Sequence, residues 1–172
     1  MAGRGFAIAC ASAGHNVVLE DVMPTNLRKA EVEYSDASLR GGYGSLELAS
    51  TVEDAVREAD IAVDFVPDEL ESKLEIFSMI DRMAPPSTIL CTPTEALSIT
   101  DLASCVYRPE RAVALRGKLS AGGAIKVLYP PKADRGVVET VERFLVTLGL
   151  EVRVEADCEE PVLSKNNQKK TF

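Results

Sequence analysis

The stretch GRGFAIACASAGHNVVLED, residues 3–21, decides how this chain folds. Two glycines precede a run of alanine and other small residues, which predicts a helix over residues 5–13 that packs closely on a sheet. A β-branched run follows and ends at Asp21. This pattern is typical of the second half of a βαβ unit that binds a dinucleotide, with phosphate at the helix N-terminus and ribose hydroxyls on the acid. A helix and a strand that ends in a solvated aspartate stay open as the alternative.

Short apolar runs alternate with helical patterns along the rest of the chain. Buried strands are predicted at residues 61–66, 88–91, 112–115, 124–129 and 151–154. Helices are predicted at residues 52–59, 70–83, 99–105 and 135–148. Alternation of this kind predicts an α/β fold with a mostly parallel, doubly wound sheet and flanking helices.

Composition narrows the class of protein. The 172 residues are 46% hydrophobic and 27% charged, which suits one globular domain. The net charge of −8 argues against nucleic acid or an anionic membrane as a partner, and no apolar run approaches the roughly 20 residues that span a bilayer. The four cysteines have no C-x-x-C spacing, so we expect neither a metal site nor a disulfide framework. We therefore expect a cytoplasmic protein with reduced thiols.

Further motifs stand in a fixed order along the chain. They are AGHNV at residues 13–17, ADI at 59–61, VPDELESK at 66–73, LSITDLA at 97–103 and RPER at 108–111. Together with GRGFAIAC at 3–10, they resemble the NAD-binding domain of the 3-hydroxyacyl-CoA dehydrogenase family, oxidoreductases of fatty-acid metabolism. The resemblance runs from about Ala2 to Asp157. It implies an N-terminally short, Rossmann-like domain over residues 1–157 with NAD as its cofactor, followed by a polar C-terminal tail over residues 158–172.

The resemblance also assigns residues to the cofactor. Gly3 lies where the domain's first helix begins, and Asp21 matches the acid that holds the adenosine ribose. Asp68 matches a family glutamate near the nicotinamide, and Lys73 matches a lysine at the cofactor site. Without the resemblance, Asp68 would be interpreted as favouring a helix dipole and Lys73 as a solvated side chain.

The family's catalytic residues are all replaced. Glu95 stands at the position of a serine in a Ser-Asn-Thr-Ser-Ser run, and Arg116 stands at the histidine of a Gly-Leu-His-Phe-Phe-Asn-Pro run. Leu119 stands at the asparagine of the latter run. The glutamate that orients the histidine aligns with Leu128 or Tyr129. The resemblance therefore implies that no catalytic residue is retained.

Proton chemistry makes this loss serious. Oxidation of a secondary alcohol by hydride transfer needs a base for the hydroxyl proton, and an imidazole supplies one at neutral pH. The guanidinium of Arg116 stays protonated and would lower the pKa of a neighbouring Glu95. We therefore predict that Glu95 and Arg116 form an ion pair that fills the old site. The sole histidine, His15, is predicted to be a turn residue at the far end of the first helix.

Two departures from the family concern binding. Residues 26–58 replace a longer helical hairpin that grips coenzyme A, and GGYG at residues 41–44 predicts a loop, so acyl-CoA binding is not expected. The family's first strand and the first two glycines of G-x-G-x-x-G have no counterpart here. Either the sequence starts inside the domain or another segment, such as one from a second protomer, fills the central slot. Unless it is filled, two strands keep unpaired edges and NAD affinity should be weak.

Three functions stay open at this point. The first is an NAD-binding domain protein with impaired 3-hydroxyacyl-CoA dehydrogenase chemistry. The second is a non-catalytic module that senses a nucleotide or binds a partner. The third is an oxidoreductase on another small hydroxy acid, in which Arg116 binds the substrate carboxylate and Glu95 takes the proton. In each case the small-molecule partner is a dinucleotide, and a homo-oligomer stays open.

Overall fold

The computed structural model describes residues 2–39, 41 and 44–157, so the predicted tail at 158–172 lies outside the described residues. Helices and strands alternate along the chain, as the sequence predicts. Their order is α1 (Ala2–Ser12), β1 (Asn16–Glu20), α2 (Pro24–Ser38), β2 (Ser45–Ala49), α3 (Val52–Val56), β3 (Ile61–Val63), α4 (Leu70–Met83), β4 (Ile89–Pro93), α5 (Ile99–Ala103), the 3-10 turn Pro109–Arg111, β5 (Ala112–Gly117), β6 (Ala124–Tyr129), α6 (Arg135–Thr147) and β7 (Glu151–Ala156).

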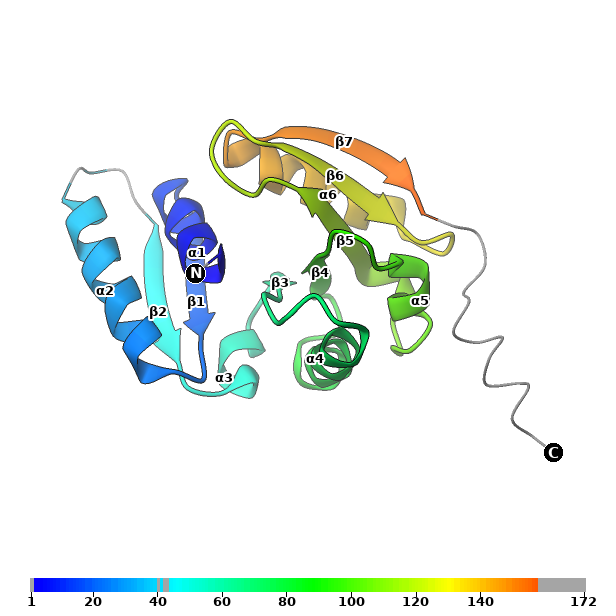
Figure 1. Cartoon of the computed structure of the whole chain (residues 1–172), viewed down its shortest axis with the longest axis horizontal. Helices are drawn as coiled ribbons and strands as arrows, with labels where there is room; N and C mark the ends of the chain where they lie inside the picture. Colours follow the sequence, from blue (N-terminus) through cyan, green and yellow to red (C-terminus); the bar gives the residue numbers. More distant parts are fainter. Residues whose placement is uncertain (1, 40, 42–43, 158–172) are drawn as a thin grey trace.

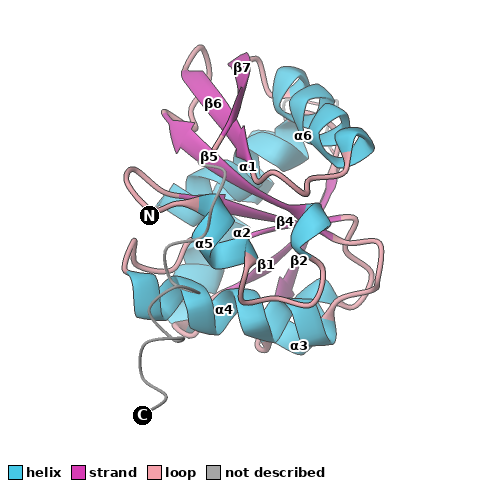
Figure 2. Cartoon of the chain, turned by 90° about the vertical axis from the view of Figure 1, so that its right-hand side faces the viewer, coloured by secondary structure: helices cyan, strands magenta, loops and turns pink. Residues whose placement is uncertain are grey.

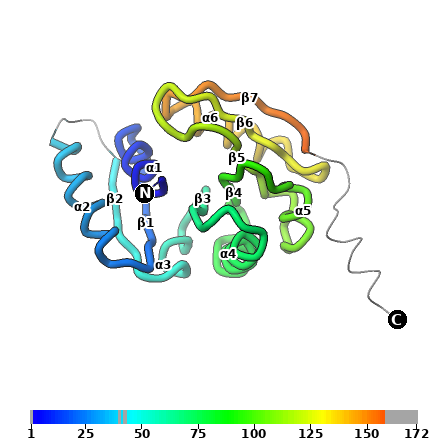
Figure 3. The backbone as a smooth tube through the Cα atoms, in the orientation of Figure 1, coloured from blue at the N-terminus to red at the C-terminus, as the bar shows by residue number. Residues whose placement is uncertain are grey.

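The strands form two sheets (Figure 1). Strands β1 and β2 pair in parallel, and a five-stranded sheet has the order β3-β4-β5-β6-β7. Adjacent strands of this sheet run parallel, except for the antiparallel pair β5 and β6. This confirms the α/β fold with a mostly parallel sheet. Figure 3 shows the backbone passing from the two-stranded sheet through α3 into β3.

Helices cover both faces of the larger sheet, as Figure 2 shows for the strands near β4. One apolar cluster joins α1 and α6 to the sheet and includes Phe6, Val113 and Val141. The other joins α4 and α5 to the opposite face and includes Phe77 and Leu102. Buried strands with apolar residues on both faces are typical of a sheet between two helical layers.

Helix ends follow local sequence signals. The side chain of Thr51 accepts a hydrogen bond from the Asp54 amide at the start of α3, and Ser98 does the same for Asp101 at the start of α5. Both side chains thus act as N-caps of the helices that follow them. Gly149, with φ of 75°, follows the last turn of α6, where a left-handed residue ends a helix.

The strands β1 and β3 both lie at sheet edges. Among the described residues no strand pairs with the second edge of either one. Helix α1 lies against both sheets, because it packs on β1 and its Phe6 ring lies 5.4 Å from the ring of Phe65, just after β3. Between β1 and β3 the described part of the domain is thus held together by side-chain packing on α1 and not by backbone hydrogen bonds between strands.

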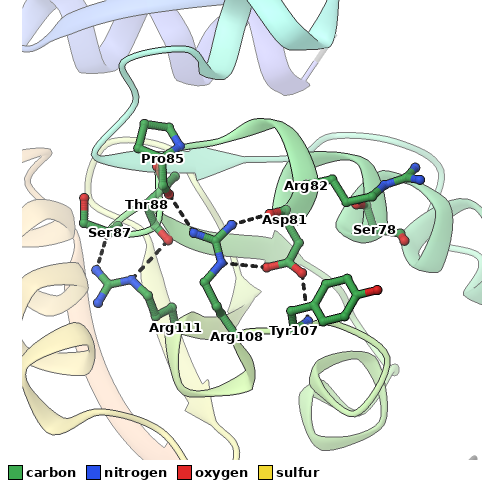
Figure 4. Close-up of polar contacts among 9 residues, drawn as sticks. All are labelled: Ser78, Asp81, Arg82, Pro85, Ser87, Thr88, Tyr107, Arg108 and Arg111. Carbon is green, nitrogen blue, oxygen red and sulfur yellow. Dashed lines mark hydrogen bonds and ion pairs between the residues drawn. The ribbon is translucent and has the colours of Figure 1, made fainter.

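The RPER motif ties the amino ends of the strands to the end of α4 (Figure 4). Arg108 Nε donates a hydrogen bond to Asp81 Oδ1 at 2.9 Å, and Arg108 Nη1 donates to the Pro85 carbonyl at 2.7 Å. The Tyr107 amide donates to the other Asp81 oxygen at 2.7 Å. Arg111 donates to the Thr88 carbonyl at the start of β4. This motif therefore has a structural role at the end of the sheet opposite to the candidate site.

Candidate functional site

The predicted site residues gather at the carboxyl ends of the strands. Asp21 follows β1, Asp68 follows β3, Glu95 follows β4, and Arg116 lies near the end of β5. In open α/β sheets this edge is where ligands bind. The structure therefore brings the predicted residues to one end of the fold.

Gly3 lets α1 approach the sheet. A Cβ atom placed at Gly3 would lie 3.2 Å from side-chain atoms of Phe65, whereas one at Gly5 would meet nothing within 4 Å. The close approach brings the N-terminus of α1 to the ligand-binding edge, where its free amides and helix dipole favour a phosphate. The N-terminus of α1 fits the phosphates of a dinucleotide, and it is the part of such a phosphate site that the described chain contains.

Asp21 is placed as predicted, at the end of β1. Its Oδ1 accepts a hydrogen bond from the Met23 amide at 2.8 Å, and its Oδ2 accepts one from the Asn26 side chain at 2.9 Å. These bonds orient the carboxylate at the start of α2. Each carboxylate oxygen has a second lone pair, so the group can still accept hydrogen bonds from ribose hydroxyls.

Lys73 is buried rather than solvated. Its Nζ donates to Asp64 Oδ1 at 2.7 Å and to the Pro93 carbonyl at 2.8 Å, and the side chains of Lys73 and Asp64 are each 1% exposed. Two of the three Nζ donors are thus used inside the protein, and the ammonium reaches a bound ligand through its charge rather than through an exposed N–H. Asp64 is not among the predicted site residues. An isolated acid inside the apolar run at residues 61–66 is the signal that could have found it, because a buried charge needs a partner.

One carboxylate oxygen of Asp64 lacks a good hydrogen-bond donor among the described residues. Among the described residues, Asp64 Oδ2 and the Thr92 hydroxyl are buried and make no hydrogen bond of normal geometry. Burial raises the pKa of Asp64, while the charge of Lys73 and the nearby Thr92 hydroxyl oppose that rise. Lys73 is therefore the group that makes a charged carboxylate tolerable here.

Asp68 faces the loop after β4. Its Oδ2 accepts a hydrogen bond from the Glu95 amide at 2.9 Å. Partial burial acts against the charge of Asp68, but hydrogen bonds from Thr94 and Glu95 and the charges of Lys73 and Arg116 outweigh it, so its pKa lies below the ordinary value. Asp68 is thus ionised at neutral pH and lies in the field of both cations.

Arg116 binds backbone carbonyls instead of Glu95. Its Nε donates to the Thr94 carbonyl at 3.2 Å and its Nη2 donates to the Leu97 carbonyl at 2.9 Å. Of the ion pairs among the described residues, none joins Arg116 to Glu95, so the expected ion pair is wrong. The loop carbonyls lie closer to the guanidinium and use two of its five N–H donors.

The other replaced positions are apolar parts of the core. Leu119 packs against one buried cluster, and Leu128 is 5% exposed within the other. His15 lies in the turn between α1 and β1, as predicted. Its Nε2 lies 2.7 Å from the Thr147 hydroxyl and its ring packs edge-on against Phe144. No imidazole therefore lies at the carboxyl ends of the described strands.

Two other expectations concern metals and membranes. The described residues contain no group of three or more histidine, cysteine or acidic side chains that could hold a metal ion. Cys10, Cys91 and Cys105 are free thiols, whereas Cys158 lies outside the described residues. None of the described helices is both long and apolar enough to cross a membrane.

Comparisons with known proteins agree with this geometry. A probable 3-hydroxybutyryl-CoA dehydrogenase of Bacillus subtilis is 28% identical over 161 residues, which cover 86% of this chain and 54% of that protein. The mitochondrial hydroxyacyl-coenzyme A dehydrogenase of Homo sapiens is 27% identical over 167 residues, with 86% and 53% covered. The chain thus spans about half the length of these relatives.

Solved structures share the fold. A 3-hydroxyacyl-CoA dehydrogenase of Archaeoglobus fulgidus matches with a TM-score of 0.75 and 27% identity, over 96% of this chain and 56% of that one. A 5-formyl-3-hydroxy-2-methylpyridine 4-carboxylic acid 5-dehydrogenase matches with a TM-score of 0.77 and 25% identity, over 96% and 58%. Both confirm the Rossmann-like architecture.

The family model for the NAD-binding domain of 3-hydroxyacyl-CoA dehydrogenase matches residues 1–116. NAD, the expected cofactor, is the cofactor of that domain, and the family consists of oxidoreductases. The match spans well over half of the chain, and the strands, the first helix and Asp21 lie where the motifs predict them. This chain belongs to the family of 3-hydroxyacyl-CoA dehydrogenase NAD-binding domains.

Proposed function

We propose that this chain binds NAD(H) and has lost the dehydrogenase chemistry of its family. The observation that carries the proposal is the role of Arg116, which stands where the family has its histidine and donates hydrogen bonds to two loop carbonyls. A guanidinium does not release its proton at neutral pH. The alcohol of a 3-hydroxyacyl substrate would therefore have no imidazole to take its proton.

The residues present suit a dinucleotide lying across the carboxyl ends of the strands. The N-terminus of α1, brought close by Gly3, would face the pyrophosphate, and Asp21 would bind the adenosine ribose. Asp68 would face the nicotinamide half, with the charge of the buried Lys73 ammonium nearby. The nicotinamide ring, when bound, supplies a hydride acceptor.

The alternative with an active hydroxy-acid oxidoreductase gains less support. It needs Arg116 to bind a substrate carboxylate, yet the Nε and one terminal nitrogen of Arg116 already donate to the Thr94 and Leu97 carbonyls. It also needs the Glu95 carboxylate as a base, and the hydrogen bond from the Glu95 amide to Asp68 fixes only the backbone of that residue. These contacts favour a role for Arg116 in holding the loop. Loss of hydroxy-acid turnover in an Arg116→Ala variant would restore the alternative.

Two further expectations join the proposal. A cytoplasmic location is proposed because the acidic composition and the scattered cysteines suit a reducing compartment. A homo-oligomer is proposed because each of β1 and β3, as described, has an unpaired edge with which another chain can pair. Light scattering of the purified chain measures its oligomeric state. A monomer at all accessible concentrations would remove the second expectation.

An equilibrium titration tests the binding proposal. NADH fluorescence is followed as the full chain is added, and ADP-ribose is then used as a competitor that shares the adenosine half. We expect saturable binding that ADP-ribose displaces and that acetyl-CoA leaves unchanged. Absence of NADH binding at millimolar concentrations would overturn the proposal and leave only a scaffold of the fold.

A further inference from the structure

The 93–97 loop, defined here as the last residue of β4 and the loop that follows it, is held by three charged side chains from three different parts of the chain. Lys73 on α4 donates to the Pro93 carbonyl at 2.8 Å. Arg116 on β5 donates to two carbonyls of the loop, at 3.2 and 2.9 Å. Asp68, between β3 and α4, accepts from the Glu95 amide at 2.9 Å. The loop is therefore fixed mainly through its backbone.

Only one of these three side chains depends on a buried counter-ion. Lys73 Nζ lies 2.7 Å from Asp64 Oδ1, and both side chains are 1% exposed. Removal of one partner of such a pair leaves an isolated buried charge, so Lys73 cannot swing away while Asp64 stays ionised. Asp64 thus fixes the ammonium that holds Pro93, although Asp64 itself does not touch the loop in any recorded hydrogen bond.

The position of the loop suggests which part of a ligand is affected. A Rossmann-like sheet consists of two halves, each of which serves one mononucleotide of the cofactor. Asp21 follows β1 in the first half, whereas Asp64, Lys73 and the loop lie at the ends of β3 and β4 in the second. The loop therefore borders the nicotinamide half and lies away from the adenosine ribose.

We propose that Asp64 is a positioning residue that, through Lys73, holds the 93–97 loop in place at the nicotinamide half of the dinucleotide site. The effect of Asp64 on the position of the loop rests on the structure alone. Its effect on ligand binding rests on the proposed NAD binding. Loss of the Asp64 charge should loosen the loop and weaken contacts to the nicotinamide half, while contacts to the adenosine half persist.

The same helix supplies a matched control. Asp81, near the other end of α4, is also buried and ion-paired, with Arg108 Nε at 2.9 Å from its Oδ1. Its contacts lie at the amino ends of the strands, far along the helix from the loop (Figure 4). Asp81→Asn therefore removes a comparable buried charge without touching the candidate site.

Amide hydrogen exchange tests the loop consequence without any ligand. Asp64→Asn should accelerate exchange of the amides of residues 94–97 on the order of tenfold, while Asp81→Asn should accelerate exchange around residues 107–111 and leave the loop unchanged. Unchanged exchange of the loop in Asp64→Asn would overturn the proposal, as would equal acceleration of the loop in Asp81→Asn.

Binding by the full chain tests the ligand consequence. We expect the Kd of NADH to rise on the order of tenfold in Asp64→Asn and the Kd of ADP-ribose to change by less than about twofold, with both unchanged in Asp81→Asn. Equal losses of affinity for NADH and ADP-ribose, or no loss of affinity for NADH, would overturn the proposal. If the unmodified chain binds no NADH, the proposed function fails, and hydrogen exchange still decides whether Asp64 positions the loop.

A second variant tests the proposal in case the Asp64→Asn protein does not fold. Asp64→Asn leaves the Lys73 ammonium buried without its partner, which can prevent folding. Asp64→Asn combined with Lys73→Met leaves no buried charge and still removes the donor to Pro93. Fast exchange of the 93–97 loop in this folded double variant supports the proposal, and exchange as slow as in the unmodified chain contradicts it.

Discussion

Arg116 Nη2 lies 2.9 Å from the carbonyl oxygen of Leu97 and donates a hydrogen bond to it. The same guanidinium also holds the Thr94 carbonyl, so the side chain that stands at the family's histidine position supports the loop after β4. A residue with this role cannot exchange a proton with a substrate. The loss of the imidazole thus coincides with a gain of backbone contacts at the same place.

These contacts predict a stability cost for Arg116→Ala. Two half-buried carbonyls would lose charged donors, so we expect the free energy of unfolding to fall by about 1–3 kcal/mol. Urea denaturation measures the change. Lys118→Ala is the matched control, because the exposed Lys118 side chain makes no hydrogen bond to any other described residue, and its effect should stay within about 0.5 kcal/mol. Equal effects of the two substitutions would contradict this account of Arg116.

The two glycines at the start of α1 should respond differently to alanine. Gly5→Ala adds a Cβ in open space within a helix and should stabilise the fold by about 0.5–1 kcal/mol. Gly3→Ala brings the same helix propensity but sets a Cβ at 3.2 Å from Phe65, so we expect no gain or a loss. Urea denaturation of both variants makes the comparison. A gain of equal size at both positions would show that α1 does not need Gly3 for its close approach.

Asp68 predicts a particular pH dependence. Its pKa in the folded state lies below the value of 3.8 expected for a free side chain, so its charge favours the folded state. This stabilisation is complete above about pH 5 and is lost as the pH falls through the folded-state pKa. The difference in stability between the unmodified chain and Asp68→Asn should therefore be constant from neutral pH to about pH 5 and shrink below about pH 4. A difference that grows on acidification would contradict the argument.

Thiol reactivity should separate the cysteines. Burial raises the pKa of the Cys10 thiol to about 12 and raises that of Cys91 as well, whereas Cys105 is exposed. In a Cys158→Ser background, we expect one thiol to react rapidly with a chromogenic disulfide reagent at pH 8 and two to react only on unfolding. Three rapidly reacting thiols would show that the core around Cys10 and Cys91 opens readily.

Local signals explain which parts of the fold are predictable from sequence. The range of α4 is predicted at residues 70–83 and found at Leu70–Met83, because a long amphipathic pattern and its flanking residues lie within one segment. Strand β2 was not predicted. Its short sequence SLELA carries an acid and is half exposed, so its only clear support is its pairing with β1.

The candidate site was predicted in position but not in its contacts. Asp21 and Asp68 lie where the strand ends require. The buried pair Asp64–Lys73 was missed, because an acid inside the apolar run at residues 61–66 indicates a buried charge but does not show which cation reaches it. The Glu95–Arg116 ion pair was wrong for a similar reason. Backbone carbonyls of a loop compete for a guanidinium, and only the folded chain shows where those carbonyls point.

The most direct test of the central claim follows protein-bound NADH after acetoacetyl-CoA is added to the NADH-saturated chain. We expect the fluorescence of bound NADH to appear on titration and then to persist, because the site holds a nicotinamide but offers no imidazole for the proton. A steady decay of NADH in proportion to the concentration of the purified 172-residue chain would contradict the account.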